Sequence, residues 1–141
     1  MIRFYDYFSE DYKYTLYSLN YQKIENERTG SLALTADDSF SVEKKKDYLC
    51  CYYTRKLYFS PEDIFSMEAQ FKILFPIKTD MDVSALTEQE ILDSLRRDVL
   101  ESLDQVAARM SLIISQTLYS ANHEPVVLPP NVLIDEENTI D

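Results

Sequence analysis

Few residues in this 141-residue sequence have a type and spacing that would support catalysis. His123 is the only histidine and lies beside Glu124, so one imidazole would have to do all general acid and base work near neutral pH. Cys50 and Cys51 are adjacent in an expected strand, where a thiol has neither the helix end nor the cationic neighbour that lowers its pKa. We therefore expect a histidine in a loop or at a helix end, two reduced and buried thiols on opposite strand faces, and no catalytic residue.

The acidic residues and the glycines do not indicate a binding site for a metal or a nucleotide. Acidic pairs at 37–38, 62–63 and 136–137 lie in expected turns or in the tail, without oxygen-ligand spacing or an apolar pocket. Phosphate-binding loops depend on several glycines, and Gly30 is the only one. We expect no metal and no cofactor. One enzyme hypothesis stays open, a small hydrolase or isomerase that uses His123.

Charge and length restrict the class of protein further. The chain has 25 acidic and 14 basic side chains, a net charge of -11, which repels nucleic acids and anionic lipid surfaces. Such acidity suits solubility, or a basic partner protein. No signal peptide or membrane-spanning run is present, so we expect a cytoplasmic protein. Its length fits one domain, over residues 1–134, followed by an acidic, disordered tail at 135–141.

The first half of the chain has the composition of an antiparallel sheet. Residues 12–25 are rich in tyrosine and predict a first strand, and Leu32 and Leu34 predict a short second one that Asp37-Asp38-Ser39 should end. A hairpin follows, with strands at 47–59 and 64–75 joined by a turn at 60–63.

Alternation in the last strand predicts a sheet with one buried face. The apolar positions of this strand share one face: Phe65, Met67, Ala69, Phe71, Ile73 and Phe75. A turn of two or four residues would set Arg55 opposite Glu68 on the polar face, whereas a turn of three or five would add Leu49 and Leu57 to the apolar face. We favour the second register, in which Arg55 is the one misfit.

A single amphipathic helix is expected over residues 87–119, where it would cover the buried face of the sheet. Thr87 and Glu90 have the spacing of a capping box. Nine turns span roughly 50 Å at 1.5 Å per residue, longer than one small sheet can bury. We therefore expect part of the apolar stripe to form an oligomer interface, a dimer or tetramer; the alternative is ordinary core with a frayed end. The interface residues would be Leu92, Val99, Leu103, Val106, Met110 and Ile113.

Ten of the eleven tyrosines lie in residues 1–58, too many for one inner face of a small sheet. Exposed tyrosines provide rigid, amphipathic contact area that suits recognition of extended peptides, although β-propensity alone could explain their number. In the favoured register, the peptide-binding face turned away from the helix would contain Tyr48, Tyr52, Tyr58, Ile64 and Leu74.

Beyond Pro125, residues 126–134 are expected to form an extended arm.

The order of these elements, followed by Pro125, Leu128, Pro130 and Asn131, resembles the SecB family of protein-export chaperones and its shorter SecB-like relatives in Gram-positive bacteria. The resemblance covers residues 12–134 in pattern and 125–133 in motif. It implies an α+β fold with a four-stranded antiparallel sheet packed on one long helix. It also implies ATP-independent holding of non-native polypeptides, with an acidic sheet face that docks a translocase motor.

Three departures from the family leave the export role and the tetramer open. Asn122-His123 stand where a glycine is usual, no second helix is expected after Ile134, and no basic Cys- or His-containing tail is present. Some SecB-like proteins instead guard an antitoxin. The alternative to a chaperone is an oligomeric adaptor that binds one specific folded partner protein.

Overall fold

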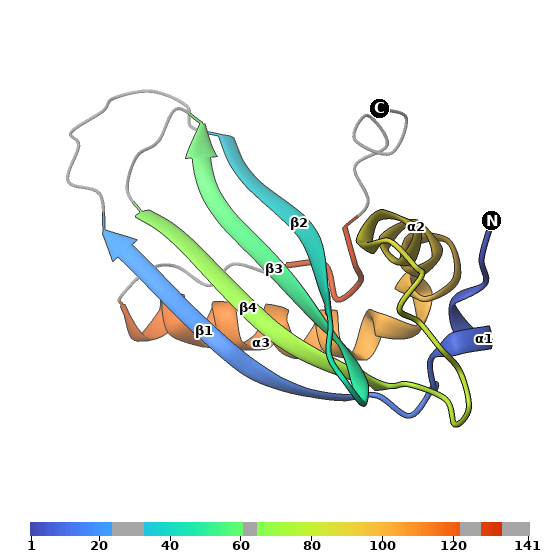
Figure 1. The fold of residues 1–141 in the computed structure, drawn as a ribbon. Helices are drawn as coiled ribbons and strands as arrows, with labels where there is room; N and C mark the ends of the chain where they lie inside the picture. The colour runs from blue at the N-terminus through green and yellow to red at the C-terminus, as the bar shows by residue number, and fades with distance from the viewer. Residues whose placement is uncertain (24–32, 61–64, 122–127, 134–141) are drawn as a thin grey trace.

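The computed structural model describes residues 1–23, 33–60, 65–121 and 128–133, and it shows an α+β fold. Four strands form one antiparallel sheet in the order β1-β4-β3-β2 (Figure 1). Their bounds are Lys13–Lys23 for β1, Ala33–Lys44 for β2, Tyr48–Ser60 for β3 and Phe65–Pro76 for β4. The sheet and its antiparallel pairing are therefore as the sequence predicted.

The register of β3 and β4 is the one favoured from the sequence. Leu49 pairs with Phe75, Leu57 with Met67, and Arg55 with Ala69, so the odd-numbered residues of both strands share one face. At the odd-numbered positions of 49–57 and 65–75 this face is fully or almost fully buried and forms the core together with the helices. Cys51 lies on this face and Cys50 on the other, and both thiols are free and buried, as expected.

The helical region is not one straight helix, and this part of the prediction is wrong. It consists of α2, Glu88–Asp98, a 3-10 turn η1, Leu100–Leu103, and α3, Asp104–Ser120. Helix α3 runs along the inner face of the sheet, whereas α2 turns away beside β2 and the short N-terminal helix α1, Phe4–Tyr7 (Figure 1). Because of this bend, both α2 and α3 pack on apolar core surface. A straight helix of the same length would extend beyond the edge of the sheet.

Contacts around Ser102 explain why the helix breaks without proline or glycine. The Ser102 amide donates a hydrogen bond to the Val99 carbonyl, three residues back, and the Ser102 hydroxyl donates a second one to the same oxygen. The Ser102 carbonyl accepts a hydrogen bond of 2.9 Å from the Tyr12 hydroxyl. These contacts satisfy backbone amide and carbonyl groups that lose their helical hydrogen-bond partners at the break.

The capping box at the start of α2 is present as predicted, with the Thr87 hydroxyl accepting a hydrogen bond from the Glu90 amide at 3.1 Å.

Strand β2 was predicted to end at Asp37, but it continues to Lys44. Its two aspartates have partners on β3: Asp37 accepts a hydrogen bond from the Tyr58 hydroxyl, and Asp38 pairs with Arg55. Cross-strand partners thus override the low β-propensity of aspartate.

No helix in the described part of the chain is long and apolar enough to span a membrane.

Candidate functional site

The outer face of the sheet, turned away from α3, carries most of the predicted peptide-binding residues. Tyr48, Tyr52, Tyr58 and Leu74 all lie there, and each is half-buried. Ile64 falls outside the described residues. Tyr17, at an irregularity in β1, joins this face and is 56% exposed. We name Tyr17, Tyr48, Tyr52, Tyr58 and Leu74 the tyrosine face.

Neighbouring side chains hold the rings of the tyrosine face in place. Tyr17 and Tyr52 form an edge-to-face pair with ring centroids 5.4 Å apart, and the Lys72 ammonium lies 5.7 Å from the Tyr17 centroid. The Tyr58 hydroxyl donates a 2.6 Å hydrogen bond to Asp37. The pKa of Tyr52 is raised to about 12, chiefly by a hydrogen bond with Cys50 and to a smaller extent by desolvation. At neutral pH Tyr52 is therefore uncharged, and the contacts of Tyr17 and Tyr58 make the face partly preorganised.

This face is not acidic, contrary to what the family resemblance implied. The charged side chains that the described strands place on it are three acids and three lysines: Asp37, Glu43, Glu68, Lys13, Lys56 and Lys72. These charges sum to zero. The net charge of -11 therefore comes from other parts of the chain, and the sheet face offers no excess of carboxylates to a basic partner.

The residues predicted to form an oligomer interface mostly belong to the chain's own core. Val99, Leu103, Val106 and Met110 have no exposed surface, and Leu92 and Ile113 are half-buried against the core. The cause is the bend between α2 and α3, which allows the apolar sides of both helices to pack against the core. Leu112 and Tyr119, 54% and 69% exposed, lie on the opposite side of α3 instead.

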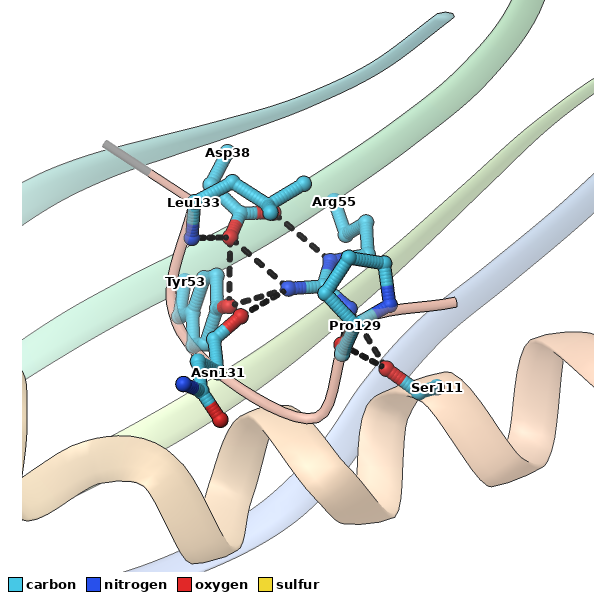
Figure 2. Close-up of polar contacts among 7 residues, drawn as sticks. All are labelled: Asp38, Tyr53, Arg55, Ser111, Pro129, Asn131 and Leu133. Carbon is cyan, nitrogen blue, oxygen red and sulfur yellow. Dashed lines mark hydrogen bonds and ion pairs between the residues drawn. The ribbon is translucent and has the colours of Figure 1, made fainter. Parts of the chain in front are cut away.

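Sequence reasoning missed a buried polar cluster on the inner face, between the sheet and α3 (Figure 2). Arg55 donates to both carboxylate oxygens of Asp38, from Nε at 2.8 Å and from Nη2 at 2.9 Å, and both side chains are fully buried. The Tyr53 hydroxyl donates to Asp38 at 2.7 Å and accepts from Arg55 at 3.2 Å. Ser111 of α3 accepts from Arg55 Nη1. We name Asp38, Tyr53, Arg55 and Ser111 the inner polar cluster.

Residues 128–133, which we name the arm, lie against this cluster (Figure 2). Arg55 donates to the carbonyl of Pro129 at 3.0 Å and to that of Asn131 at 2.8 Å. Ser111 also donates to the Pro129 carbonyl, at 2.8 Å. The Leu133 amide donates to Asp38 at 2.7 Å. The segment predicted to be an extended arm after Pro125 instead bends at Pro130 and Asn131, and side chains from two strands and one helix hold it.

The surroundings fix the charges within the inner polar cluster. Burial acts to lower the pKa of Arg55, but hydrogen bonds and charge from Asp38 and Tyr53 outweigh it and the net pKa is raised. Burial, reinforced by the Asp38 charge, raises the pKa of Tyr53. Arg55 is therefore a cation and Tyr53 a neutral donor at neutral pH. Removing either partner of the Arg55 and Asp38 pair would leave a buried charge without compensation.

One signal for this cluster was present in the sequence, namely Arg55 as the single misfit on an otherwise apolar face. A buried arginine requires a carboxylate partner, and Asp38 lies directly opposite it in the β2 and β3 register. That register depends on β2 continuing past Asp37, which composition did not indicate. His123 and Glu124, the residues of the enzyme hypothesis, fall outside the described residues.

The described chain thus has a four-stranded antiparallel sheet whose inner face is covered by a long C-terminal helix, and this is the fold of SecB-like chaperones. The SecB-like chaperone Rv1957 of Mycobacterium tuberculosis, solved in complex with a ChAD peptide from the antitoxin HigA1, Rv1956, shares it. The TM-score is 0.62 over 86% of this chain and 85% of that one, at 13% sequence identity. No protein-family model and no curated protein matches the sequence. At this identity the likeness shows a common fold.

Proposed function

We propose that this protein is a chaperone that binds extended, non-native polypeptide segments without a cofactor or catalysis. The tyrosine face carries this proposal, because it sets four tyrosines and Leu74 on one side of the sheet, open to a partner. Tyrosine rings bury large amphipathic area at little entropic cost, and they accept apolar and polar neighbours alike. Such contacts suit clients whose sequences differ.

The structural neighbour supports a polypeptide as the partner, since that SecB-like protein was solved with a peptide of an antitoxin. Export and antitoxin protection are two tasks that such binding would serve in the cytoplasm. The neutral outer face favours clients recognised by aromatic contact over docking to a strongly basic motor protein.

A second candidate is an adaptor for one folded partner. The rings of the tyrosine face have fixed positions, Tyr17 beneath Lys72 and Tyr58 bonded to Asp37. Preorganised aromatic side chains of this kind are also typical of binding sites for one folded protein. Such an adaptor would bind one protein saturably and would leave aggregation of unfolded chains unchanged.

The test is whether stoichiometric amounts of the protein prevent a chemically unfolded substrate from aggregating, measured by light scattering. We expect suppression by the wild-type chain, and its loss in the double variant Tyr52→Ser/Tyr58→Ser. Met81→Ser is the control, because Met81 is a large, exposed apolar residue that lies in the loop after β4, outside the tyrosine face. A wild-type protein that leaves aggregation unchanged would rule out general chaperoning and favour the adaptor.

A further inference from the structure

The lysines that the described strands place on the outer face of the sheet have different neighbours. Lys56 lies between Asp37 and Glu68 in the register of β2, β3 and β4, so each adjacent strand sets a carboxylate beside it. Lys72 lies between Tyr52 and a threonine of β1, and neither of them is an acid. Opposite charges on adjacent strands offset each other. The charge of Lys56 is therefore compensated within the sheet, whereas that of Lys72 is not.

Lys72 lies beside aromatic rings. Its ammonium group is 5.7 Å from the centroid of the Tyr17 ring, and Tyr17 and Tyr52 form an edge-to-face pair. Lys72 is half-buried, whereas Lys13 and Lys56 on the same face are exposed. No carboxylate in the described part of the chain forms an ion pair with Lys72. A partly buried cation gains from an aromatic ring but still lacks a counter-ion, so this position favours an added anion.

The surroundings of Lys72 add positive charge. Lys13 lies opposite Leu74, two residues along β4 from Lys72, so the two lysines are diagonal neighbours on one face. The acid across the strands from Lys13 is Glu43, and it forms an ion pair of 2.7 Å with Lys45 instead. One end of the tyrosine face is therefore locally positive, although the chain has a net charge of -11.

We propose that Tyr17, Tyr52 and Lys72 form a subsite for the carboxylate of an aspartate or glutamate side chain in an extended client segment. The Lys72 ammonium pairs with the carboxylate, while the two rings and Leu74 contact the apolar neighbours of the acidic residue. The inference rests on the proposed function, because it names the class of segment that the tyrosine face selects. Segments with an acidic residue among apolar ones fit this subsite, and basic segments do not.

The net charge of the chain predicts the opposite preference. At long range, a protein of charge -11 attracts basic peptides and repels acidic ones. At a salt concentration of about 0.15 M, charges more than about 8 Å apart are largely screened, so the groups that contact a peptide decide its affinity. A preference for an acidic peptide over a basic one therefore has to come from a local cation.

The test compares three peptides that differ at one residue, with binding to the full-length protein measured by isothermal titration calorimetry at this salt concentration. Their sequence is acetyl-Gly-Ser-Tyr-Val-Xaa-Leu-Ser-Gly-amide, in which Xaa is glutamate, glutamine or lysine. The caps remove the terminal charges, so the glutamate side chain carries the one carboxylate. We expect the wild-type protein to bind the glutamate peptide about fivefold more tightly than the glutamine peptide, the upper end of the range for partly exposed ion pairs. The lysine peptide should bind most weakly.

Three variants assign the preference to Lys72. Lys72→Glu should reverse the order, so that the lysine peptide binds most tightly. Lys46→Glu is the matched control, because it makes the same change of net charge at an exposed position in the turn between β2 and β3, outside the tyrosine face. It should retain the order of the wild type. Lys72→Gln, which should reduce the preference for glutamate over glutamine to less than about twofold, replaces Lys72→Glu if circular dichroism shows that variant to be unfolded.

The results separate the subsite from the proposed function. Equal binding of the glutamate and glutamine peptides, tightest binding of the lysine peptide, no binding of any peptide, or an unchanged order in Lys72→Glu would overturn the subsite. The light-scattering assay of aggregation on the same preparations tests the proposed function. Suppression of aggregation without a preference for glutamate would retain the proposed function and reject the subsite. A preference that depends on Lys72, without suppression of aggregation, would support the subsite and reject general chaperoning.

Discussion

Arg55 and Asp38 lie directly opposite each other on β3 and β2, and their side chains form two hydrogen bonds of 2.8 and 2.9 Å with no exposure to solvent. The same pair holds the arm, since Arg55 donates to Asn131 and Asp38 accepts from Leu133. One buried ion pair thus connects the edge strand of the sheet to a segment that follows α3. Its removal should affect both the stability of the fold and the position of the arm.

Arg55→Met is expected to destabilise the protein by about 3–5 kcal/mol, because it leaves the Asp38 carboxylate buried without its cation. Asp38→Leu should cost a similar amount for the opposite reason. The double variant should cost less than the sum of the two, with a coupling energy of at least about 1 kcal/mol. Urea unfolding monitored by circular dichroism gives these free energies. Strict additivity would show that the two side chains do not interact in solution.

The sequence predicted the core side of β3 and β4 correctly because period-two alternation in β4 leaves only two faces to choose from. The continuation of β2 could not be predicted from composition, since Asp38 is compatible with a strand only when Arg55 lies opposite it. The bend after Asp98 depends in the same way on Tyr12, a residue 90 positions before the carbonyl that it contacts. Local sequence patterns contain no information about either of these distant partners.

Tyr53 should make the protein sensitive to alkali. Burial raises the pKa of Tyr53 above the value of about 10 expected for the unfolded chain. The neutral phenol therefore contributes stability in full below about pH 10, and this contribution is lost progressively as the pH rises further towards the folded pKa. Tyr53→Phe lacks the titrating group, although it loses about 1–3 kcal/mol at neutral pH with the hydrogen bonds to Asp38 and Arg55.

The check is the free energy of unfolding of both proteins between pH 8 and pH 11. The difference in the free energy of unfolding between the wild type and Tyr53→Phe should decrease above about pH 10. Tyr119→Phe is the control for removal of an exposed tyrosine hydroxyl outside the inner polar cluster. A gap that stayed constant to pH 11 would show that Tyr53 does not lose a proton on unfolding in this range.

The capping box of α2 predicts a small and local stability effect. Thr87→Ala removes the oxygen that accepts from the Glu90 amide and should cost about 1 kcal/mol. Glu90→Gln retains an oxygen able to accept from the Thr87 amide, so the change should be within about 0.5 kcal/mol. Thermal unfolding distinguishes the two variants. Equal losses would indicate that the charge of Glu90 at the helix start matters more than the hydrogen bonds.

Self-association, if it uses α3, must use the side of that helix turned away from the sheet. Leu112 and Tyr119 lie one heptad apart there and are both more than half exposed, whereas Val106 and Met110 have no surface left for a partner. We expect light scattering to give a mass of two or four chains for the wild-type protein, and of one chain for Leu112→Glu/Tyr119→Glu. The charged side chains would remain in water in a monomer but would be desolvated in an interface.

Gln89→Glu is the control for charge on a helix, because Gln89 is exposed and already polar and lies on α2, away from Leu112 and Tyr119. It should leave the mass unchanged, and circular dichroism should show equal helix content in all three proteins. A double variant that retained the wild-type mass would place any interface elsewhere on the molecule. Val106→Glu gives a further contrast: a charge at this fully buried position should unfold the protein, since the cost of burying it exceeds what a marginally stable domain can tolerate.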